Sequence, residues 1–378
     1  MRSEYGSLVP VDIWPGVPAT LVIKYATAIR ILNDPSHFPA DPRQWQRTVP
    51  ADIPIMPMLE YRPNALRTSG REHARYRQAL TDALAGVDLN LVRTSIERSA
   101  ASVINGFATV GRADILSQYA LPMVFSVFCE ILGCPPEIGQ RVAAAQAAMF
   151  DGVDTETVNA AMGAALFDLT RLKRAHPGED ITTRLVQHST ALTDEEMIHQ
   201  LVLLFAGGIE PSFNLIANTL LLLLTDARFL SSADAPPLST GTAIDERLAT
   251  DPPMANFCIT YPPRPMTIDG QWLPPHQPVI ISMTACNTDP ALTQGLGISV
   301  DNGWNLAFSS GDHACPAPAR PYVRVLAQEI IDQLLDHLPD LELEVPQHDL
   351  VWRPGGFHRA LTELPVTFAP TRYLFPTP

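Results

Sequence analysis

The segment FSSGDHACP, residues 308–316, is the most informative stretch of the chain. Its cysteine, Cys315, stands just before a predicted amphipathic helix and follows a turn that contains Gly311. Backbone N–H groups and the positive dipole end at a helix N-terminus favour a thiolate over a thiol, and a thiolate held in this way is a good ligand for iron. The alternative is a small buried cysteine that only precedes a helix. The aromatic, glycine and histidine residues around Cys315 favour the metal ligand.

The bulk composition describes an acidic protein with enough apolar residues for a large core. The chain has 378 residues, of which 46% are hydrophobic and 17% charged, and its formal net charge is −14. This balance argues against a nucleic-acid partner, because phosphate binding needs a basic surface. The start lacks the charged-then-apolar build of a signal peptide, and no uninterrupted apolar stretch approaches the roughly 20 residues of a membrane span. We expect a cytoplasmic protein without a membrane partner.

The order of predicted elements indicates a mainly α protein with a minor β-sheet region. Proline-punctuated apolar pairs in 8–25 predict short strands, and 36–66 is a proline-rich loop of the kind that covers a site. Helices are predicted in 25–32, 72–191, 194–225 and 242–250 and after Cys315, strands after 252, and a hairpin in 341–368. We expect a sheet assembled from both ends of the chain, within one domain over 1–378.

A second anchor lies in residues 70–77, GREHARYR, at the start of a predicted helix. His73 and Arg77 are four residues apart and therefore share one helical face. Two donors on one face are suited to bind a pair of carboxylates, which an arginine does with two parallel hydrogen bonds. For such a run taken alone, a solvated, charged helix start is the alternative.

The long apolar helix predicted over 194–225 carries an unusual interruption. It opens with a capping box, TDEE at 193–196, and its middle reads GGIEPS at 207–212. Proline removes a backbone hydrogen bond and kinks a helix. Close packing against another helix explains the glycines, whereas a carboxylate such as Glu210 is costly in an apolar site unless it is paired.

Together these three segments resemble the motifs of the cytochrome P450 superfamily. The cysteine segment matches the signature FxxGxHxC at all four named positions, 70–77 carries HxxxR, and 207–212 is similar to the dioxygen-binding motif. The resemblance covers about 9–368 and implies the cytochrome P450 fold, with haem b between the long central helix and the cysteine loop and a shorter N-terminus than usual. It implies that the haem contacts are Phe308 on the sulfur side, Gly311 in the turn, the propionate ligands His73, Arg77 and His313, and Cys315 on the iron.

On the long helix, Gly207, Gly208 and Glu210 match the dioxygen motif when the alignment is made on the acid. Pro211 stands where the family has an alcohol, and Ser212 follows one place later. Proton delivery is therefore expected from Ser212, from Glu210 or from an ordered water.

Three departures from the family pattern concern arginines. In the family's ExxR motif, Glu246 aligns with the glutamate and Ala249 with the arginine, and 295–304 offers no replacement. A third arginine, which binds a propionate in the family, is missing around Thr260, where Arg264 is a candidate. These departures resemble an actinobacterial branch that tolerates the loss of ExxR. Loss of one arginine alone would leave a buried carboxylate without a partner, which is costly. We therefore expect the whole ExxR ion-pair network to be replaced.

The resemblance implies an oxidative enzyme of secondary metabolism, either a monooxygenase or a catalyst of oxidative aromatic coupling, including cross-linking of a short peptide. A non-catalytic partner or regulatory protein with the same fold is the alternative. The implied electron donor is a ferredoxin or flavoprotein reductase, docking near Arg71, Arg75, Arg320 and Arg324. The implied contacts with a small-molecule or short-peptide substrate are Met58, Asn64, Phe205, Ile209, Phe257 and Phe357.

Overall fold

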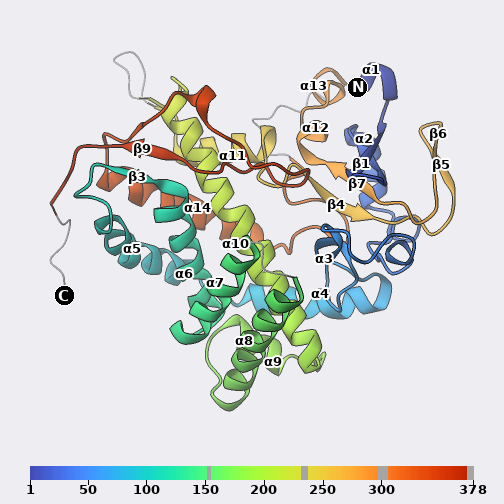
Figure 1. Ribbon diagram of the computed structural model, residues 1–378, viewed down its shortest axis with the longest axis horizontal. Helices are drawn as coiled ribbons and strands as arrows, with labels where there is room; N and C mark the ends of the chain where they lie inside the picture. The colour runs from blue at the N-terminus through green and yellow to red at the C-terminus, as the bar shows by residue number, and fades with distance from the viewer. Residues whose placement is uncertain (151–154, 231–236, 296–304, 373–378) are drawn as a thin grey trace.

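The structure is a computed structural model that describes residues 1–150, 155–230, 237–295 and 305–372. Helices form most of it, and the β-rich part lies to one side (Figure 1). The helices are α1 (Arg2–Tyr5), α2 (Tyr25–Leu32), α3 (Met56–Leu59), α4 (Gly70–Ala85), α5 (Leu89–Asn105), α6 (Leu121–Ile131), α7 (Pro136–Phe150), α8 (Thr155–Ala175), α9 (Ile181–Gln187), α10 (Asp194–Thr225), α11 (Thr240–Thr250), α12 (Met283–Asn287), α13 (Pro290–Gly295) and α14 (Ala319–His337). The strands are β1 (Leu8–Trp14), β2 (Val17–Val22), β3 (Arg112–Asp114), β4 (Asn256–Thr260), β5 (Met266–Ile268), β6 (Gln271–Leu273), β7 (Val279–Ser282), β8 (Glu342–Leu343) and β9 (Pro365–Thr367).

In the described residues the strands form separate sheets. The first has the order β1-β2-β7-β4, in which β1 and β2 are antiparallel, β2 and β7 parallel, and β7 and β4 antiparallel. The tail strands β8 and β9 join β3 in another sheet, with the order β3-β9-β8. The predicted sheet from both ends of the chain is therefore confirmed in part: the N-terminal hairpin joins two strands that follow residue 252. The tail strands form a sheet of their own with β3.

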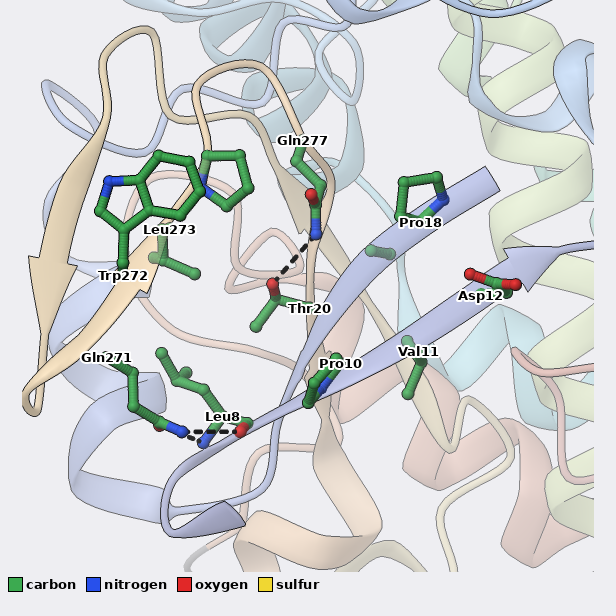
Figure 2. A pocket seen from close by; sticks show the side chains of 12 residues that line it. Leu8, Pro10, Val11, Asp12, Pro18, Thr20, Gln271, Trp272, Leu273 and Gln277 are labelled. Atoms are coloured by element: carbon green, nitrogen blue, oxygen red, sulfur yellow. Dashed lines mark hydrogen bonds between the residues drawn. The ribbon is translucent and has the colours of Figure 1, made fainter. Parts of the chain in front are cut away.

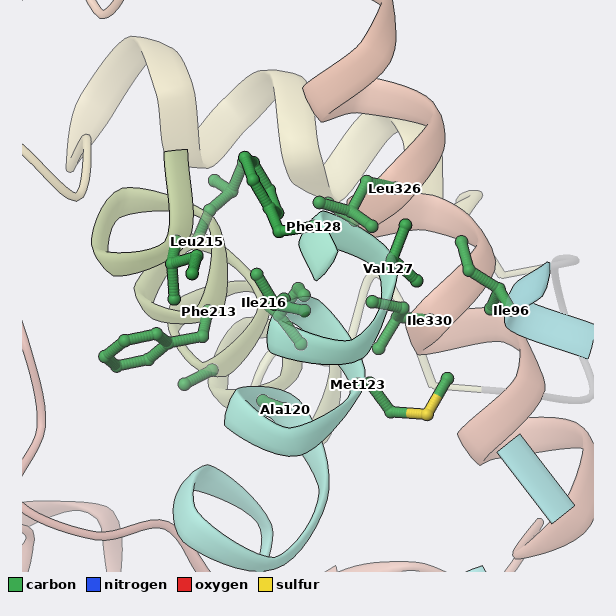
Figure 3. Packing of buried hydrophobic residues seen from close by; sticks show 14 of the residues in the cluster. Ile96, Ala120, Met123, Val127, Phe128, Phe213, Leu215, Ile216, Leu326 and Ile330 are labelled. Carbon is green, nitrogen blue, oxygen red and sulfur yellow. The ribbon is translucent and has the colours of Figure 1, made fainter. Parts of the chain in front are cut away.

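The main core lies where α10 and α14 pack against α5 and α6 (Figure 3). Figure 3 shows Met123 and Val127 of α6 beside Ile330 of α14, and Ile216 of α10 close to them. All four side chains are fully buried. Burial of a large aliphatic side chain contributes about 1.5–3 kcal/mol, so this packing holds the long helix in place.

Several local predictions are confirmed. The helix predicted over 25–32 is α2, and the strands predicted in 8–25 are β1 and β2. The helix after Cys315 is α14, and it buries Leu326, Ile330 and Leu334 on one face. Apolar periodicity within a short segment was sufficient for these elements.

Helix α10 begins with the predicted capping box, in which the Thr193 side chain accepts from the Glu196 N–H and Glu196 accepts from the Thr193 N–H. Contrary to the expected interruption, it runs without a break through Pro211. The Ser212 hydroxyl donates to Gly208 O at 2.5 Å, which adds a bond in the turn that the proline weakens.

By length and composition, α10 is the one described helix that is apolar enough to cross a membrane. Of its most apolar window, 56% is buried inside the protein. A core helix meets the same criterion, and the packing of α10 against α6 and α14 accounts for its composition.

Candidate functional site

Backbone hydrogen bonds shape the loop that carries Cys315. The Cys315 N–H donates to Phe308 O at 2.9 Å, and the Ala314 N–H donates to Gly311 O at 3.0 Å. Gly311 has φ +71°, and a Cβ at this residue would lie 2.0 Å from Leu32 O. The loop therefore needs glycine for two reasons, the left-handed backbone and the close approach to the end of α2.

Cys315 is exposed in its loop but has protein atoms around its thiol. The side chain is accessible to solvent. Many protein atoms nevertheless lie around the sulfur, and this partial desolvation raises the pKa of the Cys315 thiol. Both observations hold for a side chain that faces a cavity. The guanidinium groups of Arg77 and Arg320 oppose the rise in pKa. We expected a helix N-terminus to stabilise the thiolate. This prediction is wrong, because α14 begins at Ala319, beyond the turn that carries Cys315.

His73 of α4 and His313 of the cysteine loop lie beside each other, with ring centroids 4.0 Å apart. Their buried Nε2 and Nδ1 atoms, respectively, have no hydrogen-bond partner. Burial is the main cause that lowers the pKa of both imidazoles, that of His313 to about 3. Both rings are therefore neutral at neutral pH, and a neutral imidazole has a single N–H. His73 can donate it to a ligand from Nε2, whereas His313 also has a hydrogen bond with the backbone of Ala65 and can donate to a ligand from Nδ1 only if it gives up that bond.

Arg77 lies one helical turn beyond His73, and no ion pair involving it occurs among the described residues. Burial lowers the pKa of the Arg77 guanidinium, while negative charge at Cys315 and Asp312 opposes this. Buried donors without acceptors are costly, and a pair of carboxylates would satisfy Arg77 and the two imidazoles. The two propionates of haem are such a pair, so these residues fit that cofactor.

The two glycines of α10 differ in their surroundings. A Cβ on Gly208 would lie 2.2 Å from a ring carbon of Phe128, so this glycine permits close packing between α10 and α6. A Cβ on Gly207 would meet only a Leu203 methyl group at 3.7 Å, and Gly207 is exposed. The predicted dioxygen-facing role therefore suits Gly207 better than Gly208.

Glu210 is held by a partner from the C-terminal segment. Arg353 donates to its carboxylate, and Asn214 Nδ2 donates to the same oxygen at 3.2 Å. His358 belongs to this cluster, because Glu210 and Arg353 both act on its pKa, which burial lowers. Ser212 is 1% exposed and already donates to a backbone carbonyl. Glu210 is therefore the better placed of the two predicted proton carriers.

The predicted substrate contacts separate into two regions. Phe205 and Ile209 are buried in the main core, and the Phe205 ring packs 6.4 Å from that of Phe125. Phe257 and Phe357 meet edge to face at 6.0 Å in a different cluster.

In the segment before α4, Met58 of α3 is 40% exposed, whereas Asn64 is buried. The Asn64 side-chain oxygen accepts from the N–H groups of Leu66 and Arg67, so it serves the turn of that segment.

Two arginines near the site were not predicted, Arg67 and Arg353. Arg67 is 4% exposed, and its Nη2 donates to Met58 O at 2.5 Å. Neither belongs to a local motif, and both lie in irregular segments, so no sequence pattern marks them as site residues.

Other arginines pair with the acidic residues around the position of the missing ExxR arginine. The Glu246 carboxylate accepts a hydrogen bond at 2.8 Å from Arg228, which follows α10 in the chain. Ala249 is buried, and Asp251 accepts from Arg359 at 3.2 Å and pairs with Arg247 at 3.6 Å.

The residues around the end of β4 do not replace the missing propionate arginine. Arg264 is exposed, whereas the hydroxyls of Thr260 and Tyr261 are buried without a hydrogen-bond partner. Residues 296–304 of the irregular stretch lie outside the described residues.

The four arginines predicted to face an electron donor are not equivalent. Arg75 pairs with Glu196, and Arg324 pairs with Asp245. Arg71 and Arg320 are exposed, and the Arg320 guanidinium lies 5.8 Å from the centre of the Phe308 ring.

An open pocket of about 540 Å³ lies between β1, β2 and the β5–β6 hairpin (Figure 2). Its lining includes Leu8, Thr20, Trp272 and Gln277. None of the residues predicted for the active site lines this pocket. It is a surface feature of the β-rich region and is separate from the Cys315 site.

Comparisons with known proteins agree with the geometry. No protein-family model matches the chain. The chain is 28% identical over 372 residues to the vitamin D(3) 25-hydroxylase of Pseudonocardia autotrophica, covering 94% of this chain and 89% of the relative. It is 28% identical over 358 residues to the cytochrome P450 monooxygenase PikC of Streptomyces venezuelae, covering 92% and 84%.

Solved structures show the same architecture. The cytochrome P450 PksS of the Bacillus subtilis bacillaene polyketide synthase superposes with a TM-score of 0.82 at 24% identity, covering 97% of this chain and 95% of that one. The CYP154C4 protein of a Streptomyces species gives a TM-score of 0.85 at 24% identity, covering 97% and 93%. The predicted cytochrome P450 fold is confirmed, and so is the resemblance to the cytochrome P450 superfamily, whose members are haem-containing oxidoreductases.

Proposed function

We propose that this chain is a haem-thiolate monooxygenase of secondary metabolism in which Cys315 binds the iron. The observation that carries the proposal is the group of unsatisfied donors beside Cys315. Two buried imidazole nitrogens, His73 Nε2 and His313 Nδ1, have no hydrogen-bond partner in the described structure. The partly buried Arg77 guanidinium has no ion pair there, and the charge of Cys315 in the cysteine loop acts on it. A dianionic cofactor with an iron centre satisfies the donors and the thiol together.

When bound, haem supplies the activation of dioxygen with electrons from a redox partner. The chain's own residues position it. His73, Arg77 and His313 bind the propionate edge, and Cys315 binds the metal from the turn that Gly311 permits. Phe308 stays near the sulfur through the Cys315 N–H bond to its carbonyl.

Glu210 is proposed to orient a water molecule that passes solvent protons to the oxidation. Its carboxylate is 21% exposed and is anchored by Arg353, which is itself 28% exposed. An acid in this state is pinned in position yet accessible to water. It can exchange protons with solvent, whereas the Ser212 proton is bound to Gly208 O.

The substrate is proposed to be a small, mainly apolar molecule. The aromatic pair Phe257 and Phe357 and the exposed Met58 provide an apolar surface near the loop before α4. Oxidative coupling of aromatic groups, in a small molecule or a short peptide, is the second candidate. It is favoured by Pro211, which stands where the family has the alcohol. The comparisons do not favour a non-catalytic partner.

A ferredoxin or flavoprotein reductase is the proposed electron donor, in the cytoplasm. Arg71 and Arg320 are the exposed cations that suit an acidic partner on the cysteine side. Arg75 and Arg324 are committed to carboxylates of this chain, so they are withdrawn from the docking surface.

The experiment supplies isotopically labelled dioxygen, a surrogate ferredoxin and its reductase to the holoenzyme. Vitamin D3 and a tyrosine-containing tripeptide serve as probes for the two reaction types. Mass spectrometry distinguishes the gain of one labelled oxygen atom, which supports the monooxygenase, from the loss of two hydrogens, which supports coupling. Glu210→Gln is expected to lower the turnover by about 10²-fold or more, the usual effect of losing a general acid. Unchanged turnover in this variant would contradict the role of Glu210.

A further inference from the structure

Arg67 is a buried cation without a carboxylate partner among the described residues. It is 4% exposed. Its contacts are Met58 O, which accepts from Nη2 at 2.5 Å, and the Phe257 ring, whose centre lies 5.7 Å from Cζ. Neither contact carries a negative charge. By contrast, Arg62 of the same loop pairs with Glu60 at 2.7 Å.

Burial of an unpaired guanidinium is energetically costly, and burial is the largest cause that lowers the pKa of Arg67. One backbone carbonyl satisfies one of its five N–H donors. An anion that neutralises the charge and accepts from several N–H groups would remove this cost. The chain supplies no such anion in its described part.

The position of Arg67 points to the cysteine loop. Its charge acts on His313, lowering the pKa of that imidazole. The same charge also opposes the burial that raises the pKa of Cys258 in β4, whose thiol forms a hydrogen bond with Ser309 of the cysteine loop. The geometry agrees, because Arg67 lies beside the ring of Phe257, the residue that precedes Cys258 on β4.

Two buried hydroxyl groups at the end of β4 also lack hydrogen-bond partners. Thr260 is 6% exposed and Tyr261 2% exposed, and neither hydroxyl has a hydrogen-bond partner. Tyr261 lies close enough to Arg67 for each to influence the other's charge. Buried polar atoms are nearly always satisfied, so this group of donors fits around an oxygen-rich ligand.

We propose that Arg67 binds a carboxylate, namely a haem propionate, and so supplies the cation that the end of β4 lacks. Arg67 and Arg77 then provide one positive charge for each of the two propionates, with His73 and His313 as neutral donors. This inference rests on the haem site proposed above. A carboxylate on the substrate is the other source of the same chemistry, and the experiment separates the two.

The experiment compares Arg67→Met with Arg62→Met, an arginine of the same loop that has its own carboxylate. Each protein is loaded with haem b or with haem dimethyl ester, in which the propionate charges are absent. Loss of the cofactor to excess apomyoglobin is followed without substrate. Arg67→Met is expected to speed the loss of haem b by about tenfold, as for a lost charge-assisted hydrogen bond. Arg62→Met is expected to stay within about twofold of the unaltered protein.

With the dimethyl ester, Arg67→Met and the unaltered protein are expected to lose the cofactor at the same rate. An equal acceleration with both porphyrins would overturn the proposal and assign Arg67 to the fold. Unchanged loss of haem b would also overturn it. In that case, a loss of hexadecanoic acid binding in Arg67→Met would identify a substrate carboxylate as the ligand.

If Arg67→Met does not fold, Arg67→Lys carries the same comparison, because it keeps the charge and loses the planar donor set. Its loss of haem b is expected to be faster than that of the unaltered protein, and the difference is again expected to vanish with the ester. A difference that persists with the ester contradicts the proposal. A chain that takes up neither porphyrin would overturn the haem site as a whole, which is distinct from a failure of Arg67 alone.

Discussion

The imidazole rings of His73 and His313 lie with their centroids 4.0 Å apart, and each has a buried nitrogen without a protein partner. One ring comes from α4 and the other from the loop before α14. Two neutral imidazoles tilted by 39° gain little from each other, so we attribute their arrangement to the ligand proposed above. Arg77, one turn along α4, adds a positive charge to the same place.

Removal of a propionate ligand is expected to weaken haem retention. Arg77→Leu removes a charge-assisted interaction, so haem loss to apomyoglobin should accelerate by about tenfold or more. Arg71→Leu, an exposed arginine on the same helix, is the matched control and should change the rate by less than about twofold. Equal rates for both variants would show that Arg77 does not contact the cofactor.

Gly311→Ala is expected to destabilise the protein more than Gly270→Ala. Both glycines have positive φ, +71° and +78°, so both variants pay about 1–2 kcal/mol for the left-handed backbone. At Gly311 the new Cβ also collides with Leu32 O, whereas nothing lies within 4 Å of a Cβ on Gly270. Urea unfolding of the two variants measures the difference. A Gly311→Ala variant as stable as Gly270→Ala would refute the close approach to α2.

Gly208→Ala and Gly207→Ala are expected to have opposite effects on stability. Alanine in a helix interior is favoured over glycine by about 0.5–1 kcal/mol. Gly207→Ala meets no obstacle and should gain this amount, whereas at Gly208 the Cβ must displace the ring of Phe128, which is 5% exposed. Thermal unfolding should show a lower midpoint for Gly208→Ala. A rise in both midpoints would contradict the close contact of α10 with α6.

Glu246→Gln is expected to have a small effect on stability. Its partner Arg228 is 53% exposed, and ion pairs at the surface contribute about 0–1 kcal/mol. Asp251→Asn should be more damaging, because Asp251 pairs with both Arg247 and Arg359 and links α11 to the C-terminal segment. The free energies of unfolding of the two variants decide the matter. A larger loss for Glu246→Gln would show that the role of the ExxR glutamate is retained.

The resemblance to the family and the proposed haem-binding residues could be read from the sequence because their signals are local. Phe308, Gly311, His313 and Cys315 occupy one turn, and a fixed spacing is enough to recognise it. Helix α10 was predictable for the same reason, from its capping box and apolar composition. The unbroken passage through Pro211 was not, because the proline removes a single backbone hydrogen bond while α6 and α14 pack along the helix and hold it in place.

Features that join distant segments were missed. The partner of β2 is β7, far along the chain, and a short strand does not specify its neighbour. The partner of Glu210 is Arg353, and that of Glu246 is Arg228. Arginine is long and flexible, so its sequence position says little about which carboxylate it reaches.

The most direct test of the account is the spectrum of the reduced holoprotein with carbon monoxide. We predict the red-shifted Soret band of a thiolate-bound haem, its loss in Cys315→Ser, and its retention in Cys258→Ser, a cysteine whose pKa is sensitive to Cys315. A thiolate-type band that survives in Cys315→Ser, or that is absent from the unaltered protein, would contradict the assignment of Cys315 as the iron ligand.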